Sequence, residues 1–138
     1  MAKAKPFTVR LSAETEEWLE RQARRSKMPK GALLESLADE AIQTRRFPGL
    51  SFRGPEHDRR AWVVGTGLDV WEIVEACHQM SRERLVSETS LSERQVDLAL
   101  AYYEHHSAQI DELLADNERP LEWWQARYPG LALEPANG

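Results

Sequence analysis

The sequence predicts a mainly α-helical protein with a small N-terminal module and a second helical module that contains a short β element. Three observations lead to this prediction. One short stretch alternates apolar and polar residues, and apolar residues at helical spacing then fill two later parts of the chain. The charge also changes: residues 1–60 hold 13 Lys and Arg against 9 Asp and Glu, and residues 61–138 hold 5 against 14. A basic half suits a polyanion, and an acidic half suits another kind of partner.

The alternating stretch is PFTVRLS, residues 6–12. Phe7, Val9 and Leu11 point one way and Thr8 and Arg10 the other, which predicts a strand with one buried face. No partner strand lies nearby in the sequence, and buried ladder hydrogen bonds that are left unmade are costly. The strand therefore needs a partner from elsewhere.

Two helices are predicted to follow this strand. Ser12 is a good N-cap, and Trp18, Leu19 and Ala23 then recur on one helical face. Pro29 ends the interruption SKMP and can serve as the first residue of a new helix. The apolar residues of that second helix are Leu33, Leu34, Leu37, Ala38, Ala41 and Ile42.

So small a unit cannot bury enough surface alone. Two copies would solve both problems by pairing their strands antiparallel and interlocking their helices. Thr8 and Arg10 would then face out of a two-stranded ribbon, which fits the major groove of B-DNA. The alternative is an edge strand of a mixed fold beside an amphipathic helix pair.

Residues 5–44, with FTVRLS, EEWLERQARR and MPKGALLESLADEAI, resemble the ribbon-helix-helix family of repressors. The resemblance implies that Thr8 and Arg10 contact base edges and that Lys30, at the start of the second helix, contacts phosphate. Lys5 and Lys27 complete the expected DNA-binding set. Pro29 departs from the small polar cap that is usual in the family.

The middle of the chain, residues 44–60, is rich in Gly, Pro and Arg, and we interpret it as a linker leading into short extended pieces. Apolar β-formers flank Gly65-Thr66-Gly67, which predicts a turn or hairpin within residues 60–70. A phosphate-cradling loop is disfavoured because the full glycine fingerprint is absent.

Three helical patterns follow. The first places Val70, Ile73, Val74 and Cys77 on one face. The second is a short helix capped by Ser81. In the third, Ser92 and Gln95 form a capping box that starts one long helix, with Val96, Leu100, Tyr103, Ile110 and Leu114 along one stripe.

A short helix, a polar turn and a longer helix form a helix-turn-helix outline. Glu93, Arg94 and Asp97 give the start of the candidate reading helix a net negative charge, which opposes phosphate. We therefore expect protein contact rather than DNA binding from this outline.

Residues 48–106 resemble a domain family found in VapB-type antitoxins. The matching residues are Gly65, Thr66, Leu68, Val70, Met80, Ser81, Leu85, Val96, Ala99, Leu100 and Tyr102. Gly67 stands where the family has arginine, and residues 55–61 look longer than its usual approach loop. The resemblance implies a PIN-like ribonuclease toxin as partner.

The sequence offers little for catalysis, and we expect no enzyme, metal site or cofactor. His57, His78, His105 and His106 lack metal-ligand spacing, and no nucleophile lies in a recognisable pattern with a base. No apolar run approaches the roughly 20 residues of a membrane span. A single cysteine, Cys77, and an N-terminus without an apolar signal region lead us to expect a cytoplasmic protein.

The C-terminal tail concentrates aromatic and cationic residues within an acidic half. Such residues are frequent interface anchors, so the tail is predicted to bind the partner. The alternative is a tail that folds back on its own domain. The predicted anchors are Arg119, Trp123, Trp124, Arg127 and Tyr128.

The residue patterns alone predict a DNA-binding dimer with an acidic interaction domain. The two resemblances imply more: a homodimeric DNA-binding antitoxin of a type II toxin–antitoxin system that represses its own operon on double-stranded operator DNA. The alternative is a stand-alone ribbon-helix-helix regulator whose second domain oligomerises or senses a signal. The expected organisation is a DNA-binding and dimerisation module, an antitoxin-type domain and a tail: residues 1–46, 47–118 and 119–138.

Overall fold

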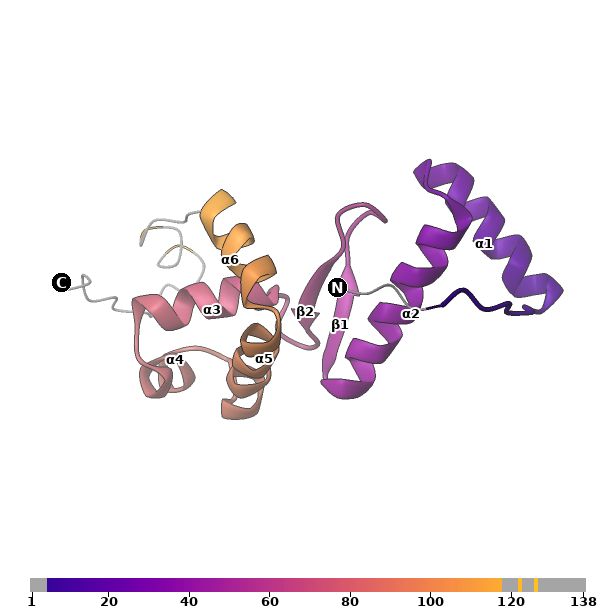
Figure 1. Cartoon of the computed structure of the whole chain (residues 1–138). Coiled ribbons are helices and arrows are strands. Elements are labelled where there is room, and N and C mark those ends of the chain that lie inside the picture. The colour runs from indigo at the N-terminus through magenta and orange to yellow at the C-terminus, as the bar shows by residue number, and fades with distance from the viewer. Residues whose placement is uncertain (1–4, 118–121, 123–125, 127–138) are drawn as a thin grey trace.

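The computed structural model describes residues 5–117, 122 and 126, and it confirms a mainly α-helical protein with a small sheet (Figure 1). The helices α1 and α2 lie at one end of the molecule and α3 to α6 at the other, with the two strands between them. The elements are α1 (Ala13–Ser26), α2 (Lys30–Arg46), β1 (Leu50–Arg53), β2 (Arg60–Val63), α3 (Val70–Gln79), α4 (Arg82–Glu88), α5 (Glu93–His105) and α6 (Ser107–Asp116).

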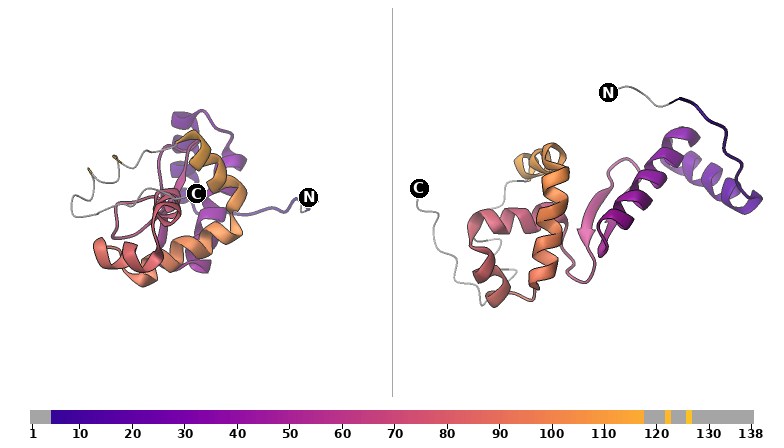
Figure 2. Two further views of the ribbon diagram at one scale, coloured as in Figure 1. Left: turned by 90° about the vertical axis from the view of Figure 1, so that its left-hand side faces the viewer. Right: turned by 60° about the horizontal axis from the view of Figure 1, so that its bottom comes forward.

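The N-terminal segment, residues 5–12, forms no strand within the single chain. It runs away from the body of the molecule (Figure 2), and the side chains of Phe7 and Val9 are 84% and 51% exposed. Leu11, at the far end of the alternating pattern, packs against the first two helices. The predicted pairing of this segment with a second chain stays a prediction.

The first two helices begin and end near the predicted residues. Ser12 caps α1 by accepting a hydrogen bond from the Thr15 N–H (3.2 Å), as the sequence predicted. Lys27 ends α1 in the left-handed conformation (φ 53°), and its N–H contacts the last carbonyls of the helix. Pro29 is the N-cap of α2 rather than its first helical residue, and it makes no side-chain capping bond.

These two helices share a very small core. Leu19, Ala23 and Leu33 are its buried members, with Met28, Leu34 and Leu37 partly buried around them. Burying a large apolar side chain contributes roughly 1.5–3 kcal/mol. A core with two buried leucines and one alanine therefore supplies only a few kcal/mol of hydrophobic stabilisation.

The sequence-based interpretation of residues 44–60 is a linker leading into short extended pieces. The extended pieces are present as β1 and the start of β2, but residues 44–46 are helical rather than linker. Residues 44–46 belong to α2, and β1 pairs antiparallel with β2 in the register Leu50↔Val63 to Arg53↔Arg60. Local patterns cannot show which segments pair, because the two strands meet across a six-residue loop.

The predicted turn at Gly65-Thr66-Gly67 is present. Thr66 Oγ1 donates to the Val63 carbonyl (2.7 Å) and accepts from the Leu68 N–H (3.0 Å). Both glycines have positive φ, 92° and 70°, which glycine adopts at little cost. The turn leads β2 directly into α3.

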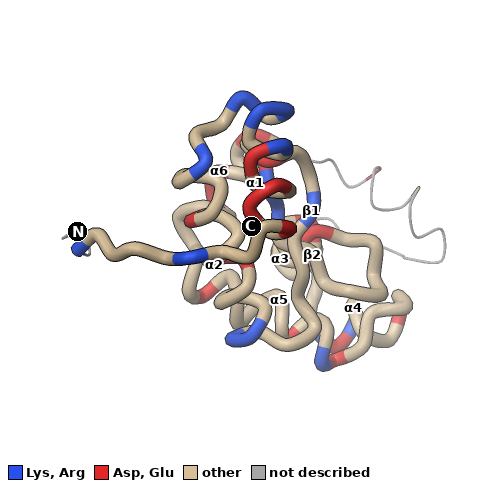
Figure 3. The backbone as a smooth tube through the Cα atoms, turned by 90° about the vertical axis from the view of Figure 1, so that its right-hand side faces the viewer, with Lys and Arg blue, Asp and Glu red and all other residues tan. Residues whose placement is uncertain are grey.

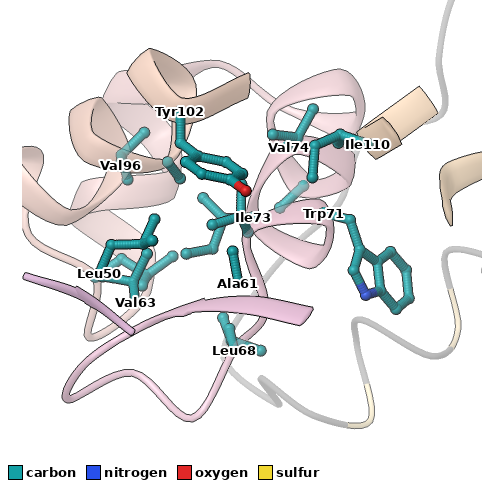
Figure 4. Close-up of a cluster of buried hydrophobic side chains, with 14 of the residues drawn as sticks. Leu50, Ala61, Val63, Leu68, Trp71, Ile73, Val74, Val96, Tyr102 and Ile110 are labelled. Carbon is teal, nitrogen blue, oxygen red and sulfur yellow. The ribbon is translucent and has the colours of Figure 1, made fainter. Parts of the chain in front are cut away.

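The main core lies among the sheet and the later helices (Figure 4). Residues Val70, Ile73 and Val74 of α3 are buried against it, as their spacing predicted. Ser81 caps α4, and Ser92 with Gln95 forms the predicted capping box of α5. Phe47 at the end of α2 also belongs to this core.

The prediction of one long helix from Ser92 to Leu114 was wrong. The chain breaks at His106, whose φ and ψ of −132° and 35° are not helical, into α5 and α6. The His106 ring stacks on Tyr102 (centroids 4.2 Å apart) and lies within hydrogen-bond distance of Gln43 Oε1. These contacts hold the His106 side chain where α5 ends and α6 begins. Ile110 of α6 is buried in the core.

Polar contacts join the two ends of the molecule. Arg59, in the loop between the strands, donates to Glu40 of α2 through Nε (3.1 Å) and Nη2 (2.7 Å). The same guanidinium group donates to the Gly54 and Phe52 carbonyls. Gln22 of α1 donates to Glu56 (3.0 Å). The loop is therefore attached to both N-terminal helices.

Candidate nucleic-acid interface

The predicted DNA-binding residues fall into two groups. Lys5, Thr8 and Arg10 are exposed on the N-terminal segment. Lys27 and Lys30 lie where α1 meets α2, and both line one shallow hollow of about 490 Å³. The structure thus brings the two lysines together, and none of the three residues of the first group lines that hollow.

We call the second region the helix corner and define it by Arg24, Lys27, Pro29 and Lys30. Basic residues gather here because α1 is acidic in its first turn and basic in its last turn (Figure 3). Pro29 provides no side-chain cap, so it leaves the first N–H groups of α2 without that partner. A Cβ added at Gly31 would meet nothing within 4 Å, so the start of α2 is open.

Sequence reasoning missed Arg24, which lines the same hollow. It also missed an ion-pair cluster at Lys30, whose Nζ lies 2.9 Å from Glu16 Oε1 and 3.3 Å from Glu20 Oε1. These hydrogen bonds to Glu16 and Glu20 raise the pKa of Lys30 above its ordinary value. The i,i+4 spacing of Glu16 and Glu20 in the sequence predicts that both carboxylates lie on one face of α1. Whether that face reaches Lys30 depends on the angle between α1 and α2, which the sequence does not show.

An uncovered apolar surface accompanies these basic groups. Trp18 of α1 is 46% exposed and Ile42 of α2 is 53% exposed, although the sequence placed both on or beside apolar helical faces. Ala38 and Ala41 are also exposed. Together with Phe7 and Val9 these side chains present apolar surface that the single chain does not bury.

The second module offers a different polar cluster, around the buried Asp69 at the start of α3. Asp69 accepts hydrogen bonds from Arg53 Nε (2.8 Å), Arg60 Nε (2.9 Å) and the Trp71 indole N–H (3.2 Å). Its carboxylate therefore ties β1, β2 and α3 together. Sequence reasoning did not single out Asp69, because its arginine partners lie on the strands.

In the structure, an arginine of α4 pairs with the acidic residues at the start of α5, so this end of the helix is less negative than its own sequence suggests. Arg82 of α4 binds Asp97 through two hydrogen bonds of 2.7 and 2.8 Å, and it lies 3.6 Å from Glu93. The pKa of Asp97 is lowered by its hydrogen bond to Arg82. These contacts fix α4 against α5 and leave Arg94 as an exposed cation there.

No group of three or more His, Cys, Asp or Glu residues with metal-binding geometry occurs in the part of the chain that the structure describes. Burial raises the pKa of the Cys77 thiol to about 11. A thiol with so high a pKa carries little of the reactive thiolate at neutral pH. Among the described helices, none is both long enough and apolar enough to cross a bilayer.

The predicted partner-binding residues Arg119, Trp123, Trp124, Arg127 and Tyr128 lie outside the described residues. Comparisons with protein-family models, with curated proteins and with solved structures found no match.

Proposed function

We propose that this chain is the DNA-binding antitoxin of a type II toxin–antitoxin system. In this proposal the N-terminal module is a ribbon-helix-helix dimer, and the second module, helix-turn-helix-like in outline, holds a toxin. The observation that carries the first part is the exposure of Phe7 and Val9 on a segment without a strand partner. Alternating apolar side chains that protrude into water in one chain are accounted for if a second copy covers them.

The small core of α1 and α2 supports the same arrangement. Two helices with three buried apolar residues are a weak folding unit. A second copy that packs its own α2 on the exposed Ala38, Ala41 and Ile42 would enlarge this core. Because the interface is made from one surface used twice, it fits a two-fold dimer.

In the dimer, Thr8 and Arg10 would project from the ribbon into the major groove. Arginine can bind guanine bidentately, and threonine can bind a base or touch a thymine methyl. Lys5, Lys27 and Lys30 would contact phosphates on either side. The open start of α2 adds backbone N–H groups, which favour an anion.

The toxin-binding part of the proposal rests on the resemblance of residues 48–106 to a VapB-type antitoxin domain and on the acidic second half. At the start of α5, Arg82 is paired with Asp97 and Glu93, so this helix end has no excess of positive charge with which to attract phosphate. In this proposal the tail contributes to the surface of the second module that holds the toxin, with Arg119, Trp123, Trp124, Arg127 and Tyr128 as anchors. Arginine can bind the acidic, metal-binding centre that a PIN-like ribonuclease possesses.

The direct test of DNA binding uses the full chain and the DNA just upstream of its own gene. We expect a gel shift at nanomolar protein with this fragment and a much weaker shift with a shuffled fragment of equal composition. Equal binding to both fragments would contradict sequence-specific repression. Binding of the operator but not of the neighbouring gene's product would favour the stand-alone regulator.

A further inference from the structure

The ion-pair cluster at Lys30 places two acids where the proposed function needs a free cation. Glu16 and Glu20 lie one turn apart on α1, and Lys30 is the first residue of α2. Both carboxylates reach the Lys30 ammonium group, at 2.9 and 3.3 Å. The cluster therefore has a net charge of −1 at a position expected to contact DNA phosphate.

A carboxylate and a phosphate oxygen are alternative ligands for the same ammonium group. A phosphate that approaches Lys30 must displace at least one glutamate or accept its repulsion. The other two cations of the helix corner differ in this respect. Within residues 5–117, neither Arg24 nor Lys27 has a carboxylate within ion-pair distance.

We propose that Glu16 and Glu20 limit the affinity of the helix corner for the DNA backbone by occupying Lys30 in the DNA-free protein. The proposal rests on the proposed function and adds a regulatory element to the same site. Binding to arbitrary DNA depends mainly on phosphate contacts. An internal competitor for one of those contacts lowers such binding while leaving the base contacts of Thr8 and Arg10 untouched.

The test compares two double variants with the same change of charge. Glu16→Gln with Glu20→Gln removes the competitor. Glu14→Gln with Glu17→Gln removes two other exposed acids of α1, neither within ion-pair distance of Lys30. Binding of each full-length variant to a mixed-sequence DNA duplex is measured by fluorescence anisotropy across a range of salt concentrations.

We expect the first variant to bind several-fold more tightly than the second. Its plot of log K against log salt should also be steeper, by up to about 0.9 per protomer, because Lys30 then releases one more counterion from the DNA. A merely structural role of the ion pairs would change thermal stability without steepening this plot.

A third comparison isolates Lys30 itself. In a Lys30→Ala background, the Glu16→Gln and Glu20→Gln changes should raise the affinity for duplex DNA no more than the Glu14→Gln and Glu17→Gln control does. Equal gains for both double variants in the wild-type background would overturn the proposal in favour of a net-charge effect. If the wild-type chain and all variants fail to bind duplex DNA even at low salt, the proposed function itself fails.

Discussion

Arg10 is the residue on which sequence recognition depends under the proposed function. Replacing Arg10 with alanine should cost roughly 1–3 kcal/mol for each bidentate guanine contact and relax the sequence preference. Lys30→Ala should instead weaken binding about equally for all sequences. A fluorescence titration against the operator and its single-base variants separates the two. An Arg10→Ala variant with unchanged preference would show that the ribbon does not read the DNA.

Asp69 is the residue whose loss should most affect the junction of sheet and α3. Asp69→Asn should lower the free energy of unfolding by about 1–3 kcal/mol, because the carboxylate is buried and binds two arginines. This range allows for solvent screening, since both arginine side chains are about a third exposed. Asp58→Asn is the control: its 57% exposed side chain also binds Arg60, and it should cost less than about 1 kcal/mol in urea unfolding.

At the scale of helices and strands, the sequence was most informative where structure is local. The caps at Ser12, Ser81 and Ser92 depend on residues within one turn, and each was predicted. The pairing of β1 with β2 was missed, because it depends on contacts between separate segments. The break at His106 was also missed, because no glycine or proline marks it in the sequence. In the candidate site, Lys30 was singled out by the ribbon-helix-helix resemblance, and its role in DNA binding stays a prediction. Its partners Glu16 and Glu20 were missed, because they lie on the other helix.

The break between α5 and α6 should make stability depend on pH. Burial, the largest effect, lowers the pKa of His106 below its ordinary 6.5, against the opposing attraction of Asp39. The unfolded chain therefore binds this proton more readily, and stability falls as pH falls below about 6.5. The free-energy difference between wild type and His106→Gln in urea should shrink over the same range. Parallel pH profiles for the two proteins would contradict this.

At the scale of the whole molecule, the proposed function predicts that the tail is needed for toxin binding and not for DNA binding. Deleting residues 119–138 should leave a dimer that still binds the operator but no longer retains the toxin encoded by the neighbouring gene in a pull-down. Circular dichroism of the deletion variant provides the control for folding. A truncated protein that unfolds, or one that keeps its partner at full affinity, would assign the tail a structural role.

The loop between β1 and β2 is attached to both N-terminal helices, which restricts how the second module can move relative to the first. Because Arg59 binds Glu40 and Gln22 binds Glu56, the proposed dimer would hold its two acidic modules in fixed positions relative to the proposed DNA-binding ribbon. All of this depends on one feature, the pairing of the N-terminal segments of two chains.

Amide hydrogen exchange of residues 7–11 tests that pairing most directly. In a two-stranded antiparallel ribbon, every second N–H group along this segment donates to the second chain and exchanges slowly. We expect marked protection in a protein whose mass in solution is twice the 15.9 kDa of one chain. A Val9→Glu variant should lose both the protection and the doubled mass. Rapid exchange throughout residues 7–11 in the wild-type protein would contradict the ribbon and the function proposed from it.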